Sequence, residues 1–325
     1  MRKSFAGIYL LFILRALQGQ DPQFTQFYAN PLYLAPSFAG ATQQDRVSIV
    51  YRNQWPEMPG TFVTFTCAYD HFFESFNSGV GVLVMRDVAG SGNLSLTNAA
   101  VQYSYDIKIN NYWHVRPGAQ FVYTQQGIDY NQLIWGTMLN GPGVGPGTEA
   151  PPEETKADID FGSSVLAYSD KLWFGVSVDH LLTPNYGLWY ENADWPIKVS
   201  VYGGAQIIHK GRLLSPIDES LSLAFNFRHQ YIYNQLDLGL YWYKAPLMLG
   251  FWYRGIPVIS KDKRGDALAF LVGYKMDQIR VGYSYDFTIS NLVSSTGGAH
   301  EISLVYEFKT TRKRLKRRMV PCPEF

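Results

Sequence analysis

The amino-acid sequence predicts an all-β protein: a transmembrane antiparallel β-barrel of the outer-membrane type, with about 14 strands. Three observations predict this fold. Apolar and polar residues alternate along most of the chain, as they do in strands whose two faces meet different surroundings. Aromatic residues make up 16% of the 325 residues and charged residues only 17%. The last alternating stretch, residues 299–308, closes on Phe308 and is followed by a run of basic residues.

Residues 1–19 have the order of a secretory signal peptide. Arg2 and Lys3 precede an apolar stretch at residues 5–14, and Gly19 is a small residue at the expected cleavage point. A buried N-terminal helix is the alternative interpretation. Ten apolar residues are too few to span a bilayer as a helix, and no later stretch of the sequence approaches the ~18 required. Any membrane role must therefore come from strands.

The following segment, residues 20–45, is rich in aromatic residues and proline. The prolines prevent a regular central strand, yet the aromatic rings need burial. A barrel of about 14 strands leaves interior space that side chains alone fill poorly. We therefore expect a plug inside the lumen or across its periplasmic mouth, with an unstructured leader as the alternative. The residues expected to matter here are Phe24, Phe27, Tyr28, Asn30, Pro31 and Pro36.

The barrel itself is expected within residues 46–308. In one strand, for example, Val281, Tyr283 and Phe287 alternate with small or polar residues. Many such runs approach the ~9–11 residues that cross a bilayer at a tilt. The expected strands lie near residues 46–52, 61–72, 78–87, 94–106, 113–127, 157–169, 172–182, 197–209, 219–231, 234–243, 247–256, 266–276, 279–288 and 299–308.

The lengths of the connections favour a membrane barrel over a soluble periplasmic β-protein. If the mature N-terminus is periplasmic, the even-numbered connections are periplasmic, and those at 170–171 and 277–278 are short. The external connections at 128–156, 182–196 and 289–298 are long, and the tight external connection at 232–233 is the clearest exception. Bacterial outer-membrane barrels have short periplasmic turns and long external loops.

The first external connection contains two prolines and a glycine, which fix its shape at low entropic cost. It could serve as a docking knob or could simply be a stiff loop. The residues of this turn, with the strand end that leads into it, are Arg52, Asn53, Gln54, Trp55, Pro56, Pro59 and Gly60.

Four motifs, in order along the chain, resemble one known family. They are DPQFTQFYANPLYLAPSFAG (residues 21–40), YRNQWPEMPGTF (51–62) followed by AYD (68–70), GAHEISL (298–304), and the final PCPEF (321–325). Together they resemble the PorP/SprF family of outer-membrane proteins. The resemblance implies a place in the type IX secretion and gliding-motility machinery of Bacteroidota, with a barrel of the fatty-acid-transporter type. It also implies partners: the periplasmic ring and linker proteins of that system, and a secreted surface adhesin or other exported client.

The C-terminal tail, residues 309–325, is basic although the rest of the chain is acidic. Behind a signal peptide, nucleic acid is not an expected partner. The tail could bind an acidic periplasmic partner or the peptidoglycan-associated ring, lie against anionic headgroups, or be an overhang without a role. Its Cys322 could pair with another protein or remain free. The candidate partner-binding residues are Lys309, Arg312, Lys313, Arg314, Lys316, Arg317, Arg318 and Cys322.

No catalytic or metal-binding constellation stands out in the sequence. The six histidines are scattered and lack metal-binding spacing such as HExxH. Glu153, Glu154, Asp158 and Asp160 cluster beside the long loop, without the ligand rhythm of a calcium site. We therefore expect no enzymatic activity and no cofactor. The expected function is that of an accessory in secretion and surface anchoring, with a transporter of hydrophobic or small solutes as the alternative.

Overall fold

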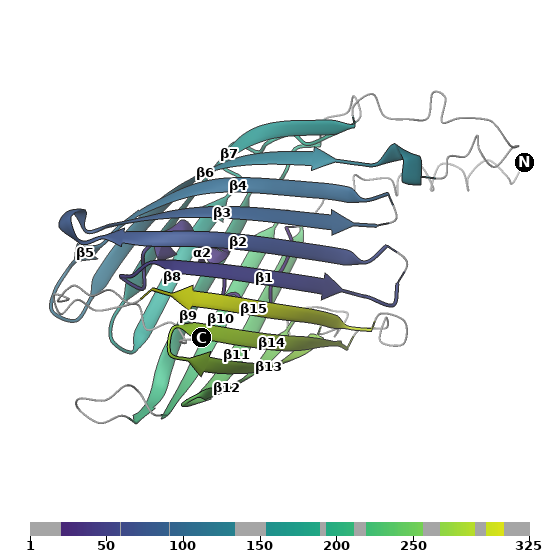
Figure 1. Ribbon diagram of the computed structural model, residues 1–325. Coiled ribbons are helices and arrows are strands. Elements are labelled where there is room, and N and C mark those ends of the chain that lie inside the picture. The colour runs from purple at the N-terminus through teal and green to yellow at the C-terminus, as the bar shows by residue number, and fades with distance from the viewer. Residues whose placement is uncertain are drawn as a thin grey trace, which may run out of the picture.

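The computed structural model describes residues 21–58, 60–90, 92–133, 154–188, 193–210, 219–255, 267–289 and 297–308. Within these ranges, 14 antiparallel strands close into one barrel, as the sequence predicts. Pairing of β4 with β6 and of β1 with β15 completes the ring, so the first and last strands lie side by side (Figure 1). A short strand, β5, adds two residues to the edge of β6.

The strands lie close to their predicted positions, and short helical turns accompany them. The elements are α2 (Pro31–Leu34), η1 (Pro36–Phe38), β1 (Arg46–Gln54), β2 (Phe62–Phe73), η2 (Glu74–Phe76), β3 (Ser78–Ala89), β4 (Leu94–Tyr105), β5 (Ile107–Lys108), β6 (His114–Gly127), η3 (Tyr130–Gln132), β7 (Thr155–Tyr168), β8 (Leu172–Asp179), β9 (Lys198–Lys210), β10 (Glu219–Gln230), β11 (Tyr233–Lys244), β12 (Leu247–Arg254), β13 (Ala267–Met276), β14 (Ile279–Thr288) and β15 (Ala299–Glu307).

The two faces of the barrel wall differ as the alternation predicts. In β14, Val281 and Tyr283 point outward and are 42% and 44% exposed. Ser284 and Asp286 of the same strand point inward and are buried. An outward apolar and aromatic surface around a polar interior is typical of a barrel whose outer face meets lipid. In the described part of the chain, no helix is both long and apolar enough to span a membrane.

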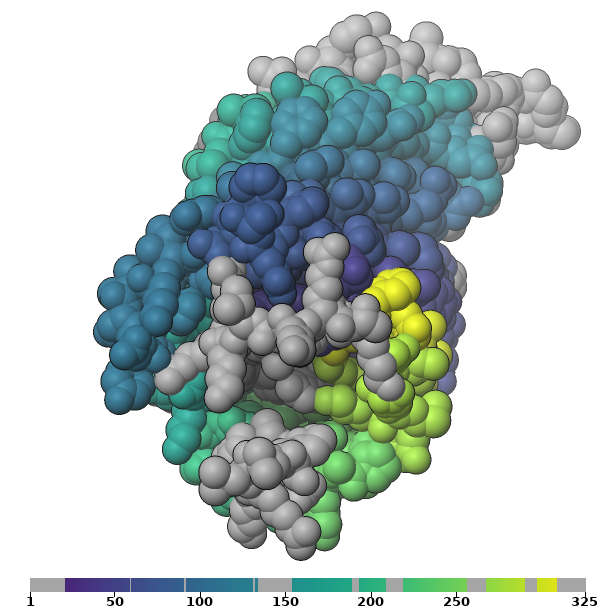
Figure 2. Space-filling model, turned by 60° about the vertical axis from the view of Figure 1, so that its left-hand side comes forward, coloured from purple at the N-terminus to yellow at the C-terminus, as the bar shows by residue number. Residues whose placement is uncertain are grey.

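Most connections at one end of the barrel are shorter than those at the other, although the two-residue connection 231–232 lies at the end with the long ones, and the connection 211–218 at the end with the short ones. At the end called here the turn end, β11 and β12 are joined by residues 245–246, and β13 and β14 by residues 277–278. The chain enters β1 and leaves β15 at this end, where the Phe308 N–H donates to the Asp45 carbonyl at 3.0 Å. The opposite end, called the loop end, carries the long connections 128–154 and 180–197. Figure 2 shows the barrel turned so that the turn end comes forward, with β15 in yellow beside the purple start of the chain.

The interior of the barrel is occupied by the chain's own residues 21–45, called here the luminal segment. Figure 1 shows its helix α2 between the front and back walls. Phe27 packs edge-on against Trp252 with ring centroids 4.9 Å apart, and Tyr28 packs against Trp173 at 5.5 Å. The prolines that prevent strand pairing start α2 and η1 instead. The aromatic rings of this segment are therefore buried inside the lumen.

Glycines in the wall allow the luminal segment to approach closely. A Cβ atom at Gly79 would lie 1.9 Å from the Ala39 carbonyl oxygen. A Cβ atom at Gly118 would lie 2.4 Å from the Ser37 backbone nitrogen. Real Cβ contacts are never this short, so both positions must remain without a side chain while the segment is in place.

Candidate functional site

Buried charges attach the luminal segment to the wall in the loop-end half of the barrel. The backbone N–H groups of Thr25 and Gln26 donate to the two carboxylate oxygens of Glu301 at 2.8 and 2.7 Å. Arg52 donates through Nη1 to Thr25 Oγ1 at 2.9 Å and to Glu301 Oε2 at 3.0 Å. Its Nη2 donates to Asp286 Oδ2 at 2.8 Å. One arginine of β1 thus joins the segment to β14 and β15.

The same contacts continue around the wall to β10 and β12. Arg254 donates through Nη1 to Asp286 Oδ2 at 3.1 Å and through Nη2 to Thr25 Oγ1 at 3.0 Å. Its Nε lies 3.6 Å from Asp237 Oδ1, and Asp237 also pairs with Arg228. Buried charges are tolerated only when they are paired and hydrogen-bonded, and here each charge has an opposite neighbour. The set Thr25, Arg52, Arg228, Asp237, Arg254, Asp286 and Glu301 is called the arginine network.

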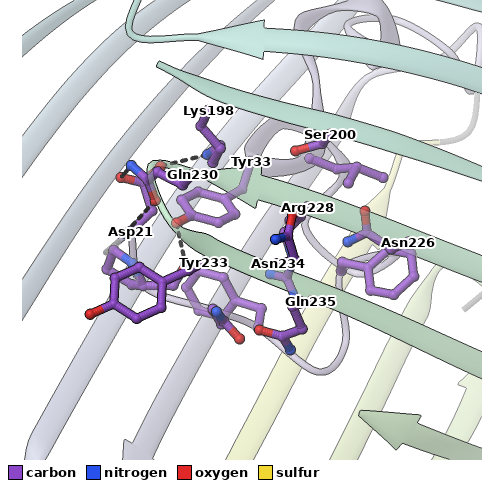
Figure 3. Close-up of a pocket in the computed structure, with 15 residues that line it drawn as sticks. Asp21, Tyr33, Lys198, Ser200, Asn226, Arg228, Gln230, Tyr233, Asn234 and Gln235 are labelled. Carbon is purple, nitrogen blue, oxygen red and sulfur yellow. Dashed lines mark hydrogen bonds and ion pairs between the residues drawn. The ribbon is translucent and has the colours of Figure 1, made fainter. Parts of the chain in front are cut away.

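A second group of polar side chains holds the first described residue of the chain. The carboxylate of Asp21 pairs with Lys198 at the start of β9, and it accepts hydrogen bonds from Trp195 Nε1 at 2.8 Å and from His180 Nε2 at 3.0 Å. The Asp21 N–H donates to Gln230 Oε1 at 3.3 Å. Figure 3 shows Asp21 beside Lys198 and Gln230. These five residues, called the Asp21 cluster, place the start of the segment at the loop end.

His180 occupies an irregular part of the barrel wall. The predicted strand at 172–182 ends as β8 at Asp179, because His180 has a φ of +61° and turns its ring toward the lumen. Its Nδ1 lies 2.7 Å from Asp160, while its Nε2 faces Asp21. Burial alone would lower the pKa of His180, but the charge of Asp21 and the hydrogen bonds with both carboxylates raise it to about 9. His180 is therefore a charged link between wall and segment at neutral pH.

The segment is also fastened near the turn end. Arg116 of β6 donates through Nη2 to the Ala39 carbonyl. The Gly40 N–H donates to Asp70 Oδ2 at 2.8 Å, and Asp70 is held in turn by Arg46 Nε at 2.8 Å. The luminal segment therefore runs from the loop end to the turn end, with charged anchors at both.

The residues predicted from the aromatic and proline pattern all lie in the lumen and are buried: Phe24, Phe27, Tyr28, Asn30, Pro31 and Pro36. Asn30 donates to Thr66 Oγ1 at 2.8 Å. The sequence analysis missed Thr25 and the acidic residues that receive the segment. The available signal was the position of Asp286 and Glu301, which are charged residues at inward positions of membrane strands.

The predicted external turn divides into two parts. Arg52 does not belong to the turn but to the arginine network inside the lumen. Trp55 lies at the loop end, where its N–H donates to the Gly298 carbonyl at 2.8 Å and its ring packs edge-on against Phe62 at 5.4 Å. Pro56 and Gly60 follow in the turn, whereas Pro59 lies outside the described residues. The predicted signal peptide, residues 1–19, and the basic tail, residues 309–325 with Cys322, also lie outside them.

Two cavities lie on either side of residues 21–23. The larger, of about 440 Å³, adjoins the arginine network and the strand ends beside the external turn. The smaller, of about 130 Å³, is shown in Figure 3. Its lining includes Tyr33, Ser200, Asn226, Arg228, Asn234 and Gln235.

The described residues contain no group of three or more metal-ligating side chains. Two of the acidic residues beside the long loop have contacts within the protein. Asp158 accepts a hydrogen bond from the Asn185 N–H at 3.0 Å, and Asp160 meets His180. Glu153 lies outside the described part of the chain.

A family model described as "Type IX secretion system membrane protein PorP/SprF" matches residues 16–306 of the chain. Among solved structures, the Ralstonia pickettii toluene transporter TbuX is similar with a TM-score of 0.51 and 10% identity, over 86% of this chain and 93% of that chain. The P. putida toluene transporter TodX has a TM-score of 0.48 and 10% identity, over 85% and 93% of the two chains. The Acinetobacter baumannii outer membrane protein Omp33 has a TM-score of 0.43 and 10% identity, over 82% and 99%. No curated protein matches the sequence. At this identity the likeness to TbuX shows the fold alone, an outer-membrane barrel.

Proposed function

Because the chain belongs to the PorP/SprF family of type IX secretion system membrane proteins, we propose that it is a non-enzymatic accessory of that secretion and gliding machinery. It assists the export or surface anchoring of secreted proteins by binding other proteins at the two ends of its barrel. The periplasmic ring and linker proteins bind at the turn end. A secreted adhesin or another exported client binds at the loop end.

The observation that carries this proposal is the filled lumen. A conduit needs a continuous path, but the luminal segment occupies the interior and buried charges hold it at both ends. Releasing it would take the backbone donors away from Glu301 and Asp70, although Arg52 and Arg46 would still pair with them. A buried carboxylate that loses hydrogen bonds without gaining water is destabilised. The segment therefore acts as a plug, and the barrel offers its two ends as rigid platforms.

The basic tail is the proposed contact with the periplasmic proteins. It follows Phe308, which lies at the turn end beside Asp45. Short turns of bacterial barrels face the periplasm, so the tail would emerge there. It holds seven of the chain's 28 Lys and Arg residues, a charge that suits an acidic partner. Anionic lipid headgroups are the competing target.

The test is affinity purification from the native outer membrane, with captured partners identified by mass spectrometry. The test variant carries alanine at Lys313, Arg314, Lys316, Arg317 and Arg318. The matched control, Lys313→Arg with Lys316→Arg, keeps the charge. We expect the alanine variant to lose the periplasmic partners and the control to keep them. If the alanine variant still captured the periplasmic partners, the tail would not be their binding site. If that variant lost only its binding to anionic liposomes, the tail would bind lipid headgroups instead.

A second candidate, a transporter of hydrophobic or small solutes, is favoured by the two loop-end cavities. TbuX, the similar solved barrel, is a toluene transporter. The lining of the larger cavity here is rich in charged and amide side chains, which suits a small polar solute better than a hydrocarbon. Solute uptake by liposomes that contain the purified protein would favour this candidate over the accessory role.

A further inference from the structure

The larger loop-end cavity has the size of a ligand site. It holds about 440 Å³, whereas one buried water needs only about 10–15 Å³ measured in this way. The arginine network forms one side of it, through Arg52, Arg254 and Asp286. Gln54 and Trp55, at the end of β1, form another. The cavity is thus built from the same motif that provides the external turn.

The charges of the cavity wall do not favour an anionic ligand. Both arginines that line it already donate to Asp286, so their charge is compensated within the protein. Two further acids line the cavity: Asp21, which pairs with Lys198, and Asp87. Asp87 accepts a hydrogen bond from Thr64 Oγ1 at 2.6 Å. Among the described residues no Lys, Arg or His forms an ion pair with it. A free phosphate or carboxylate would therefore meet a neutralised or acidic surface.

Amide side chains supply most of the remaining polar lining. Gln23, Gln54 and Gln235 all border the cavity. Gln54 Oε1 accepts from Arg52 at 3.5 Å and Gln235 Nε2 donates to Asp237 at 2.8 Å. The Gln54 NH₂ group can still donate to a ligand, and the Gln235 carbonyl oxygen and Asp87 Oδ2 can accept from one. Such planar groups hydrogen-bond to adjacent hydroxyls, which both donate and accept. A hydrocarbon would displace water from these polar groups without replacing the lost hydrogen bonds, so the lining suits a ligand that is polar but uncharged.

An aromatic surface borders the same cavity. Trp55 and Phe62 both line it, and their rings lie edge-on with centroids 5.4 Å apart. The Trp55 N–H donates to the Gly298 carbonyl, and its indole packs against Phe62, so both backbone and ring have a protein contact before a ligand binds. Indole faces provide a flat apolar contact for the C–H face of a ring that is polar at its edges.

We propose that this cavity binds one or two sugar residues of a neutral saccharide. The amides of Gln54 and Gln235 and the carboxylate of Asp87 bind its hydroxyls, and Trp55 stacks on one ring face. The site is at the loop end, the side that faces out of the cell in bacterial barrels, where surface glycans are found. The proposal does not depend on the proposed function, because it concerns a ligand of the barrel and not its protein partners.

The experiment uses the full chain, purified and folded in detergent. A glycan array with neutral and acidic oligosaccharides is followed by calorimetric titration with maltotriose, chitotriose, trigalacturonate and a neutral pentapeptide. We expect a neutral saccharide to bind, and Trp55→Leu and Asp87→Asn each to weaken it at least about tenfold. The control Trp113→Leu, at the turn end, should bind as the original protein does.

Several results would overturn the proposal. The proposal is wrong if no neutral saccharide binds, or if Asp87→Asn and Trp55→Leu leave the binding of a neutral saccharide unchanged. It is also wrong if only trigalacturonate or only the peptide binds. If Trp55→Leu does not fold, Asp87→Asn decides, because it keeps the size of the side chain. Loss of saccharide binding with intact capture of periplasmic proteins would separate this site from the proposed function.

Discussion

Replacing Arg52 with methionine tests how strongly the luminal segment is held. Methionine keeps an unbranched apolar stem of similar length but removes the guanidinium. The change deletes three hydrogen bonds of 3.0 Å or shorter, to Thr25, Glu301 and Asp286. Glu301 then keeps only its two backbone donors from the segment, and Asp286 keeps Arg254.

The expected cost follows from the burial of these groups. Arg52 is 3% exposed and Glu301 0%, so water cannot replace the lost partner. Breaking a buried ion pair by removing one member costs about 3–5 kcal/mol. Removing both charges, in Arg52→Met with Glu301→Gln, leaves no uncompensated carboxylate at this position. The double variant should therefore be less destabilised than the sum of the two single variants by about 1–3 kcal/mol.

The assay is urea unfolding of the barrel in detergent micelles, with hydrogen exchange of residues 21–30 as a local readout. Arg52→Met should lower the free energy of unfolding by several kcal/mol and accelerate exchange in the segment. A cost below about 1 kcal/mol, typical of a solvent-exposed pair, would refute the reasoning. So would strict additivity in the double variant.

Other changes probe the close approach, the loop-end anchor and the lipid face. Gly118→Val should displace the luminal segment and expose it to protease. The control Ala119→Val changes the next residue, which faces outward, and should leave the segment protected. If protease cut the segment equally slowly in both variants, the close approach at Gly118 would be contradicted. The pKa of His180, about 9, lies above the usual ~6.5, so its stabilisation is complete below about pH 6.5 and is lost as the pH rises through about 9. Hydrogen exchange of residues 21–24 should speed up over that range, and His180→Gln should remove this component; an identical pH profile in the variant would rule out the histidine. Val272 faces outward at the middle of β13, and Val272→Arg should lower the free energy of unfolding in liposomes by about 2–4 kcal/mol. Met276→Arg, at the end of the same strand, should lower it by only about 0–1 kcal/mol. Equal losses of stability would argue against lipid on this face.

The strands could be predicted because their signal is local. Alternation of period two gives the inward and outward faces, as Val281 and Ser284 illustrate. Most connection lengths distinguish the two ends of the barrel, with 231–232 as an exception. The position of the luminal segment could also be predicted, because Phe24 and Phe27 need burial and the prolines beside them cannot join a sheet. The family resemblance agrees with the family model over residues 16–306.

The contacts inside the lumen could not be predicted in the same way. Thr25 meets Glu301 across 276 residues of sequence, and alternation does not say which strands face each other across a closed ring. For the same reason Arg52 was assigned to the external turn, although its side chain points into the lumen two residues before the strand ends. The early end of β8 at Asp179 depends on the partners of His180, which are distant in sequence as well.

Solute permeability of liposomes tests the central claim most directly. The claim is that the luminal segment closes the barrel, so that the protein works through its two ends. Liposomes with the intact protein should exclude small sugars and ions, and liposomes with a variant lacking residues 21–40 should admit them. Equal permeability of the two proteins, with both folded as barrels, would contradict the account.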